Sequence, residues 1–402
     1  TPLTSWSAYS LRKTWNQAKD QVAPWWGENS KEAYASGLAN LATGLGNWSN
    51  SKTGKRTGPT IRFPRFKGKR RAMSCRFTTG SFGLASTDRR HVRLPRIGVV
   101  RTHESTRKLA RHTKRGTARI RSATVSRQSG RWQVAFSVEI ERADPPPTRL
   151  DTVVGVDLGI TSLAVLSTGE IVRNPKHLEV AQRELRRLQR QAARRVGPDR
   201  RVHQPSSNRW RRTQARIARL HTAVANARRD GLHKLTTRLA ATHGTVVVED
   251  LHVAGMLKNR RLARHIAGVG WGELRRLLGY KTGRYGGRLV VADRWYPSSK
   301  TCSACHAVKT KLRLSERMFH CDQCGLVLDR DLNAARNLAA LVSSHSWWAT
   351  ENEPDGNPGK THSVWATGTA TGRPTRTTPG GPTPRRKARL RSRLHTFPER
   401  QH

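Results

Sequence analysis

The first 150 residues change from a helical to a strand-like hydrophobic period. Over residues 5–50, apolar side chains recur at steps of three and four, which predicts one face of a helical region: Tyr34, Leu38, Leu41, Leu45 and Trp48. Ser30 stands where an N-cap is expected. Over residues 57–150 the period falls to two, and one alternating run predicts a strand face: Trp132, Val134, Phe136, Val138 and Ile140. Residues 123–125 are its expected partner, across a turn at 128–130.

This second stretch predicts a small β-barrel-like domain with a basic surface. Its cations gather in one segment around two phenylalanines and a proline: Arg62, Arg65, Lys67, Lys69, Arg70 and Arg71. Residues 143–147, which include a triple proline, are typical of a linker. A new domain is therefore expected after it.

From residue 151 the pattern is that of an α/β domain. Short apolar runs at 153–156, 163–166, 170–172, 246–248 and 289–292 predict strands. Between them lie a long basic helical region, about 175–242 with a break near Gly197 and Pro198, and a helix at 271–284. Beyond about residue 350 the chain is rich in Gly, Pro, Thr and Arg, so we expect a disordered basic tail.

The chain carries a formal net charge of +49 over 402 residues. Self-repulsion of that size opposes compaction, so a polyanion is the expected partner, and nucleic acid is the simplest one. No apolar run is long enough to span a bilayer, so a membrane partner is not expected. Four of the five cysteines are clustered and no signal peptide opens the chain, which indicates a reducing, cytoplasmic compartment.

Three acidic residues stand at the ends of predicted elements. Asp157 follows the apolar run 153–156, Glu249 follows 246–248, and Asp331 lies where a helix begins. Phosphodiester hydrolysis needs an activated water and a stabilised leaving oxygen, and divalent ions held by carboxylates can provide both. Each acid alone would be an ordinary surface residue, but together they predict a catalytic Mg²⁺ site. Asp329 is the alternative for the third position, unless it caps the helix.

Two Cys-x₂-Cys pairs, separated by fifteen residues, predict a zinc ribbon formed by Cys302, Cys305, Cys321 and Cys324. Four thiolates at this spacing close a tetrahedron around one Zn²⁺ and leave no open position, so the metal is expected to be structural. Gly325 fits the tight turn that such a knuckle needs. His306 and His320 flank the cluster and could each replace a cysteine, although loop histidines beside a complete site are the simpler interpretation.

Arginines recur through the long helical region with few acids to offset them. The first run is Arg183, Arg186, Arg187, Arg190, Arg194 and Arg195, and the second is Arg209, Arg211, Arg212, Arg216 and Arg219. We expect these side chains to contact phosphates, which positions a nucleic acid without reading its sequence.

Five motifs together resemble the TnpB family of bacterial insertion sequences, which is similar to the compact type V CRISPR effectors. They are Gly-Val-Asp-Leu-Gly at 155–159, Val-Val-Glu-Asp-Leu at 247–251, Trp-Tyr-Pro-Ser-Ser-Lys-Thr-Cys at 295–302, the paired cysteine knuckles, and Asp-Leu-Asn-Ala-Ala-Arg-Asn at 331–337. The resemblance covers about residues 150–342 well and the preceding region loosely. The set is far more specific than any one motif.

The resemblance implies an α/β fold with a ribonuclease H-like RuvC nuclease domain. The implied layout is a helical recognition lobe at 1–56, a β-barrel-like wedge domain at 57–147, the RuvC domain at 148–300, the inserted zinc ribbon at 301–326, the final RuvC helix at 327–345 and a disordered basic tail at 346–402. Asp157, Glu249 and Asp331 would be the catalytic metal-binding acids, because the family's third acid stands two places before the Asn of Asn-Ala-Ala.

The implied function is that of an RNA-guided DNA endonuclease with Mg²⁺ as catalytic and Zn²⁺ as structural cofactor. Its partners would be a guide RNA from the transposon end and double-stranded target DNA, with base pairing supplying most of the specificity. We expect a bacterial, nucleoid-associated protein. The family normally begins with a short basic strand of the barrel, so we expect this chain, which starts at Thr1, to be truncated. The alternatives are an RNA-guided DNA-binding protein or repressor that does not cut, and a transposase.

Overall fold

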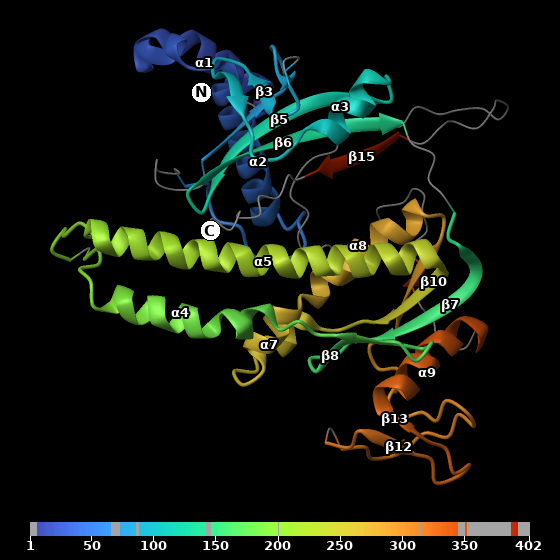
Figure 1. The fold of residues 1–402 in the computed structure, drawn as a ribbon. Coiled ribbons are helices and arrows are strands. Elements are labelled where there is room, and N and C mark those ends of the chain that lie inside the picture. The colour runs from blue at the N-terminus through green and yellow to red at the C-terminus, as the bar shows by residue number, and fades with distance from the viewer. Residues whose placement is uncertain are drawn as a thin grey trace. The chain divides into compact units, whose positions relative to one another are not determined.

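The computed structural model describes residues 6–65, 73–85, 88–141, 146–199, 201–313, 315–344, 350–351 and 387–392. It divides into two compact units, Thr1–Arg142 with Gly359–His402 and Ala143–Pro358 (Figure 1). Part of the predicted basic segment, most of the predicted linker and nearly all of the predicted tail at 346–402 lie outside the described residues. None of the helices in the described ranges is long and apolar enough to cross a membrane.

The first unit opens with helices that are separated by a short 3₁₀ turn. α1 spans Ala8–Val22, η1 spans Pro24–Glu28 and α2 spans Lys31–Lys52. The predicted helical region is interrupted at Pro24 because a proline ring cannot continue a helix. Ser30 caps α2 as predicted, since its hydroxyl accepts a hydrogen bond from the Glu32 N–H at 3.3 Å.

Two antiparallel sheets complete the first unit. One has the order β1-β5-β6-β15, formed by Ser74–Phe77, Ala118–Gln128, Arg131–Glu141 and Lys387–Ser392. The other has the order β2-β3-β4, formed by Gly83–Leu84, His91–Leu94 and Gly98–Arg101. They share one core around Phe77, Val92 and Phe136. Helix α3 (Arg107–Lys114), which the hydrophobic pattern did not predict, packs Leu109 against it.

The hairpin of β5 and β6 follows the predicted alternation with one exception. Residues 123–125 pair with residues 134–136, as predicted. Residues 129 and 130 have φ angles of 50° and 84°, the left-handed conformations that a two-residue hairpin turn requires. Phe136 is buried, but Trp132, predicted for the same buried face, is 62% exposed. Trp132 lies next to the turn, where the strand has run past the end of the core.

A six-stranded sheet forms the centre of the second unit. Its order is β14-β11-β10-β7-β8-β9, in which β7, β10 and β11 run parallel and the outer neighbours pair antiparallel. The strands are β7 (Arg149–Asp157), β8 (Ser162–Leu166), β9 (Ile171–Arg173), β10 (His243–Glu249), β11 (Arg288–Ala292) and β14 (Thr350–Glu351). The five apolar runs predicted as strands coincide with β7 to β11.

Helices cover both faces of this sheet. α5 (Asn208–Thr242) and α8 (Trp271–Arg284) pack on one face, and α9 (Arg330–Ser344) packs on the other. Alternate residues of β10 pack on opposite faces of the sheet. Val246 and Val248 belong to the core under α5 and α8, and Val247 belongs to the core under α9. α4 (His177–Ala193) runs antiparallel to α5, and α6 (Val253–Met256) and α7 (Ala263–Val269) lead into α8 (Figure 1).

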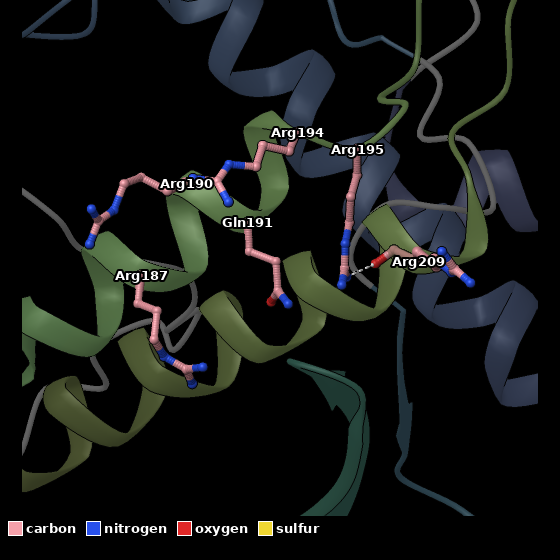
Figure 2. Close-up of a pocket in the computed structure, with 6 residues that line it drawn as sticks. All are labelled: Arg187, Arg190, Gln191, Arg194, Arg195 and Arg209. Atoms are coloured by element: carbon pink, nitrogen blue, oxygen red, sulfur yellow. Dashed lines mark hydrogen bonds between the residues drawn. The ribbon is translucent and has the colours of Figure 1, made fainter.

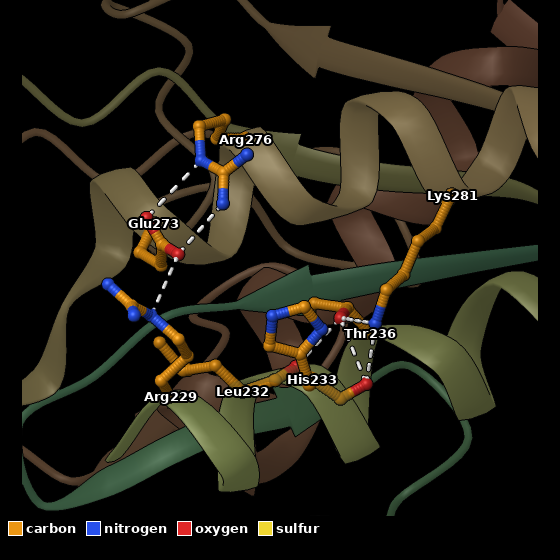
Figure 3. Close-up of polar contacts among 7 residues, drawn as sticks. All are labelled: Arg229, Leu232, His233, Thr236, Glu273, Arg276 and Lys281. Carbon is orange, nitrogen blue, oxygen red and sulfur yellow. Dashed lines mark hydrogen bonds and ion pairs between the residues drawn. The ribbon is translucent and has the colours of Figure 1, made fainter. Parts of the chain in front are cut away.

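Helix α8 carries a buried lysine that has no carboxylate partner among the described residues. Lys281 is 5% exposed, and its ammonium donates hydrogen bonds of 2.6, 2.8 and 2.7 Å to oxygens of α5: the carbonyl of His233 and the hydroxyls of Thr236 and Thr237. The nearby carboxylate of Glu273 is held by two arginines instead (Figure 3). Burial lowers the pKa of Lys281 to about 8.

The free energy of unfolding is expected to rise between pH 8 and 10.5, because the unfolded lysine, with its ordinary pKa of 10.5, keeps a proton that the folded protein releases. Below pH 8 both states are protonated and the burial cost is constant. Lys281→Met should remove this rise, whereas Lys234→Met, at an exposed position of α5, should retain it. Urea unfolding across this pH range measures the difference. A pH profile for Lys281→Met that coincides with the wild type would contradict the assignment.

Candidate active site and metal centre

The strands that carry the first two predicted acids end side by side. Asp157 is the last residue of β7, and Glu249 is the last residue of β10. The strands are parallel, and Val156 pairs with Val248, one residue before each acid. Because the carboxyl ends of parallel neighbours reach the same edge of a sheet, both carboxylates lie at that edge, where ligands of α/β sheets generally bind.

Asp331, in the first turn of α9, joins them from the helix that covers one face of the sheet. Burial raises the pKa of Asp157 well above its usual range, and the charges of Glu249 and Asp331 raise it further. Burial also raises the pKa of Glu249, again with a contribution from Asp331. The three predicted acids therefore lie within electrostatic reach of one another. A divalent cation would relieve the repulsion among them.

Asp329, the alternative third acid, caps α9. Its Oδ1 accepts hydrogen bonds from the N–H groups of Asp331 and Leu332, both at 3.0 Å, which is the pattern of an N-cap. The carboxylate of Asp331 interacts instead with the other two acids and with the guanidinium of Arg330, 3.0 Å away. The geometry thus favours Asp331 over Asp329 as the partner of Asp157 and Glu249.

A close backbone contact seats α9 on β7. A Cβ atom on Gly155 would lie 1.9 Å from the carbonyl oxygen of Ala335 and 2.6 Å from the nitrogen of Ala339, so no side chain fits there. Gly155 precedes Asp157 by two residues, and Ala335 follows Asp331 by about one helical turn. This contact therefore sets the separation of the first and third acids.

Three residues that stand within the quoted motifs, but to which the sequence analysis gave no role, hold the second acid and the loop beside it. The Ser298 hydroxyl donates to Oε1 of Glu249 at 2.7 Å. The Asn337 amide donates to the carbonyls of Ser298 and Thr301 at 2.8 and 2.6 Å, and the Asn333 amide donates to Thr301 at 2.7 Å. Both asparagines are fully buried. Their spacing of four residues on a predicted helix was the available signal, because it places two amides on one face.

The four cysteines come together as predicted. The Sγ atoms of Cys302 and Cys324 lie 3.6 Å apart, and those of Cys305 and Cys321 lie 3.5 Å apart. The ligand atoms of the four cysteines all lie within 4.8 Å of one another, and within the described ranges this is the one group of three or more candidate ligands gathered closely enough to hold a metal ion. Backbone N–H groups of residues 324 and 323 lower the pKa of the Cys321 thiol to about 6. The cluster could hold a metal ion.

The two cysteine pairs have the same backbone conformation. In each, the N–H of the first cysteine donates to the carbonyl five residues later at 2.8 Å, and the N–H four residues later donates back at 3.0 Å. Gly325 and His306 occupy equivalent turn positions, with φ angles of 72° and 61°. His306 is therefore a turn residue with no place among the four clustered ligands. The second cysteine pair lies between two paired strands, β12 (Met318–His320) and β13 (Val327–Asp329). The second of these strands leads into α9.

Two family models match the chain. Residues 135–260 match a family described as "Probable transposase", and residues 271–338 match one described as "Cas12f1-like, TNB domain". Among solved structures, the chain is similar to the protein in a cryo-EM structure of a Cas12f1–sgRNA–target DNA complex. The TM-score is 0.44 and the identity 16%, and the match covers 81% of this chain and 75% of that one.

Curated relatives match over most of the chain. A protein of Mycobacterium tuberculosis (strain CDC 1551 / Oshkosh) named "Putative RNA-guided DNA endonuclease" is 42% identical over 349 residues, which is 82% of this chain and 74% of the relative. The similarly named InsQ of Escherichia coli (strain K12) is 31% identical, over 69% of this chain and 68% of the relative. A TnpB-like protein, L79, of Acanthamoeba polyphaga mimivirus is 26% identical over 33% of the chain. The chain belongs to the TnpB family of transposon-encoded proteins.

Proposed function

We propose that this protein is an RNA-guided DNA endonuclease of an insertion sequence, with Asp157, Glu249 and Asp331 as its catalytic acids. The observation that carries the proposal is the meeting of three carboxylates from β7, β10 and α9 at one edge of the sheet. The names of the relatives support RNA guidance. A net charge of +49 suits a protein that holds RNA and DNA together.

Mg²⁺ is the proposed catalytic metal, held by the three acids. Clustered carboxylate oxygens at an open sheet edge are the ligands that this hard cation prefers. When bound, Mg²⁺ would stabilise charge on the phosphate and help to generate the attacking hydroxide. The protein's own residues prepare the site: the Ser298 hydroxyl orients the Glu249 carboxylate, and the contact of Gly155 with α9 positions Asp331.

The domain layout that the resemblance implied is proposed for the whole chain. The five-stranded part of the second sheet, β9-β8-β7-β10-β11, with helices on both faces, supports a ribonuclease H-like RuvC domain at 148–300 that is completed at 327–345. The ribbon at 301–326 lies between the second and third acids in sequence. The helices at 1–56 are assigned to a recognition lobe, and the two antiparallel sheets of the first unit, apart from β15, to a wedge domain at 57–147.

The four cysteines are proposed to bind a structural Zn²⁺. A tetrahedral site with Zn–S bonds of about 2.3 Å has sulfur atoms roughly 3.8 Å apart, close to the 3.5 and 3.6 Å observed. The side-chain Oδ1 of Asn333 accepts a hydrogen bond from the Ser303 N–H at 2.9 Å. The ribbon is thereby joined to the helix that carries Asp331.

Cys321→Ser is expected to abolish zinc binding and to lower DNA cleavage at least about tenfold, because the unfolded ribbon no longer supports α9. Elemental analysis should find about one zinc per wild-type chain and none in the variant. Cys75→Ser, in β1 of the other unit, is the matched control and should keep its zinc. A zinc-free but active wild type, or zinc retained by Cys321→Ser, would contradict the assignment.

The two alternatives make different predictions for the same site. A guided repressor that does not cut is expected to have lost a catalytic acid, whereas all three are present here and lie near enough for their charges to interact. The family description "Probable transposase" keeps the second alternative in view. A transposase would join the ends of DNA strands, so a strand-transfer product in place of simple cleavage would favour it.

Co-purified RNA and target cleavage test the proposed function together. The chain would be co-expressed with the flanking transposon-end DNA, and its bound RNA sequenced. After the guide segment is reprogrammed, the complex would be mixed with Mg²⁺ and a plasmid library that carries the matching target beside randomised bases. The expected result is transposon-end RNA and cuts in plasmids that share one flanking motif. RNA binding without cuts would support the repressor, and an absence of bound RNA would refute RNA guidance.

A further inference from the structure

The hairpin of α4 and α5 contains a pocket that the proposed nuclease chemistry does not use. It lies over the last turns of α4 and the first turn of α5 (Figure 2). Its lining consists of one glutamine and five arginines: Gln191, Arg187, Arg190, Arg194, Arg195 and Arg209. All five belong to the arginine runs that were predicted to contact phosphates. The pocket is therefore a specific place where those runs converge.

Much of the positive charge in this pocket is not neutralised by the protein. Arg187 pairs with Glu184 at 2.6 Å. Arg195 donates to the carbonyl of Arg209 at 2.7 Å and to the Thr213 hydroxyl, which fixes the end of α4 against α5. The remaining guanidinium groups have no carboxylate partner within the described ranges: Arg190, Arg194 and Arg209. The positive end of the α5 dipole adds to their field. The pocket is thus suited to a ligand with more than one negative charge.

Gln191 adds an unsatisfied acceptor to this cationic lining. Its Oε1 atom is buried and has no hydrogen-bond partner among the described residues. A buried acceptor is unfavourable until a donor reaches it. The phosphates and deoxyriboses of a DNA backbone carry no O–H donor, whereas each ribose of RNA offers a 2′-hydroxyl. A ligand that supplies both the anions and the donor is an RNA backbone.

We propose that this pocket binds the backbone of an RNA strand. The phosphates contact Arg190, Arg194 and Arg209, and a neighbouring ribose 2′-hydroxyl donates to Gln191. The proposal rests on the proposed function, in which the RNA is the guide RNA. It assigns the α4–α5 hairpin to the guide and not to the DNA target. Arg195 acts as a positioning residue, since its own hydrogen bonds are already made within the protein.

Salt-dependent RNA binding by charge-matched variants tests the pocket. The full chain, stripped of nucleic acid, would be titrated with its co-purified RNA and with DNA of the same sequence. The first variant is Arg190→Gln with Arg194→Gln, and the control is Arg260→Gln with Arg261→Gln, which removes the same charge from exposed positions outside both the pocket and the two arginine runs. The pocket variant should bind RNA about tenfold more weakly, and the slope of log affinity against log salt concentration (the salt slope) should become smaller in magnitude by about 1 to 2. The control should weaken RNA binding by about threefold or less.

Gln191→Leu tests the ribose contact separately. It should lower the preference for RNA over DNA by several-fold and leave the salt slope unchanged, because it removes no charge. Equal losses in both arginine double variants would overturn the pocket as a specific site, and an unchanged RNA preference in Gln191→Leu would overturn the 2′-hydroxyl contact. A wild-type chain that binds no RNA would refute the guided function as well. A wild type that binds RNA with no effect of the pocket variants refutes the pocket alone.

Discussion

Asp157→Asn is expected to reduce guide-dependent DNA cleavage at least about a thousandfold while RNA binding changes less than about twofold. Asparagine preserves the shape of the side chain but removes the negative charge that would hold Mg²⁺. Burial, Glu249 and Asp331 all raise the pKa of Asp157, so ionising this carboxyl group costs more free energy in the folded protein than in the unfolded chain. Without divalent ions the variant should therefore be at least as stable as the wild type.

Mg²⁺ should reverse that order of stability. A cation that binds the folded acids raises the melting temperature of the wild type, and it should have a smaller effect on Asp157→Asn. Asp151→Asn is the matched control, because Asp151 is an exposed acid on the same strand. Single-turnover cleavage and thermal unfolding, each with and without Mg²⁺, check the two halves of this prediction. Cleavage by Asp157→Asn at the wild-type rate, or an equal Mg²⁺ effect on both proteins, would show that Asp157 is not a ligand.

Gly155→Ala is expected to lower the free energy of unfolding by at least about 3 kcal/mol and to abolish cleavage. The new methyl group would lie 1.9 Å from the carbonyl oxygen of Ala335, so α9 must move away from β7 and carry Asp331 with it. The contact involves backbone on the helix side. No change of side-chain rotamer can relieve it.

Gly231→Ala is the matched control for Gly155→Ala. Gly231 lies within α5, and a Cβ atom there meets nothing within 4 Å. Alanine at this position should raise stability by up to about 1 kcal/mol, because glycine is the weaker helix former. Urea unfolding and cleavage of a matched target measure both variants. A Gly155→Ala protein with wild-type stability and activity would disprove the role of this contact.

The central strands and long helices of the second unit could be predicted because their signals are local, whereas the short helices α6 and α7 were not predicted. The apolar run 246–248 identified β10, and the period of residues 271–284 matches α8. α3 was missed because it is a short basic helix with Leu109 as its one apolar contact to the core. The exposure of Trp132 could not be predicted, because alternation within a strand does not show where the core ends. The hydrophobic pattern thus locates helices and strands better than it locates the point along each element where burial ends.

The candidate site was predictable in its residue types but not in its supporting contacts. Asp157 and Glu249 could be found because each follows a buried strand. The hydrogen bond from Ser298 to Glu249 depends on the path of a loop. The packing of α9 against β7 depends on a contact between Gly155 and Ala335, which are 180 positions apart in the sequence. Neither leaves a periodic signal in the sequence. The resemblance favoured Asp331 over Asp329, and the capping hydrogen bonds of Asp329 agree with that choice.

Guide exchange tests the central claim most directly. Two complexes that differ only in the guide segment of their RNA would each be incubated with Mg²⁺ and two plasmids, each matching one guide, beside the corresponding Asp157→Asn complexes. The account predicts that each wild-type complex cuts the plasmid that matches its guide and spares the other, and that Asp157→Asn cuts neither. Cutting that ignores the guide, or that persists in Asp157→Asn, would contradict it.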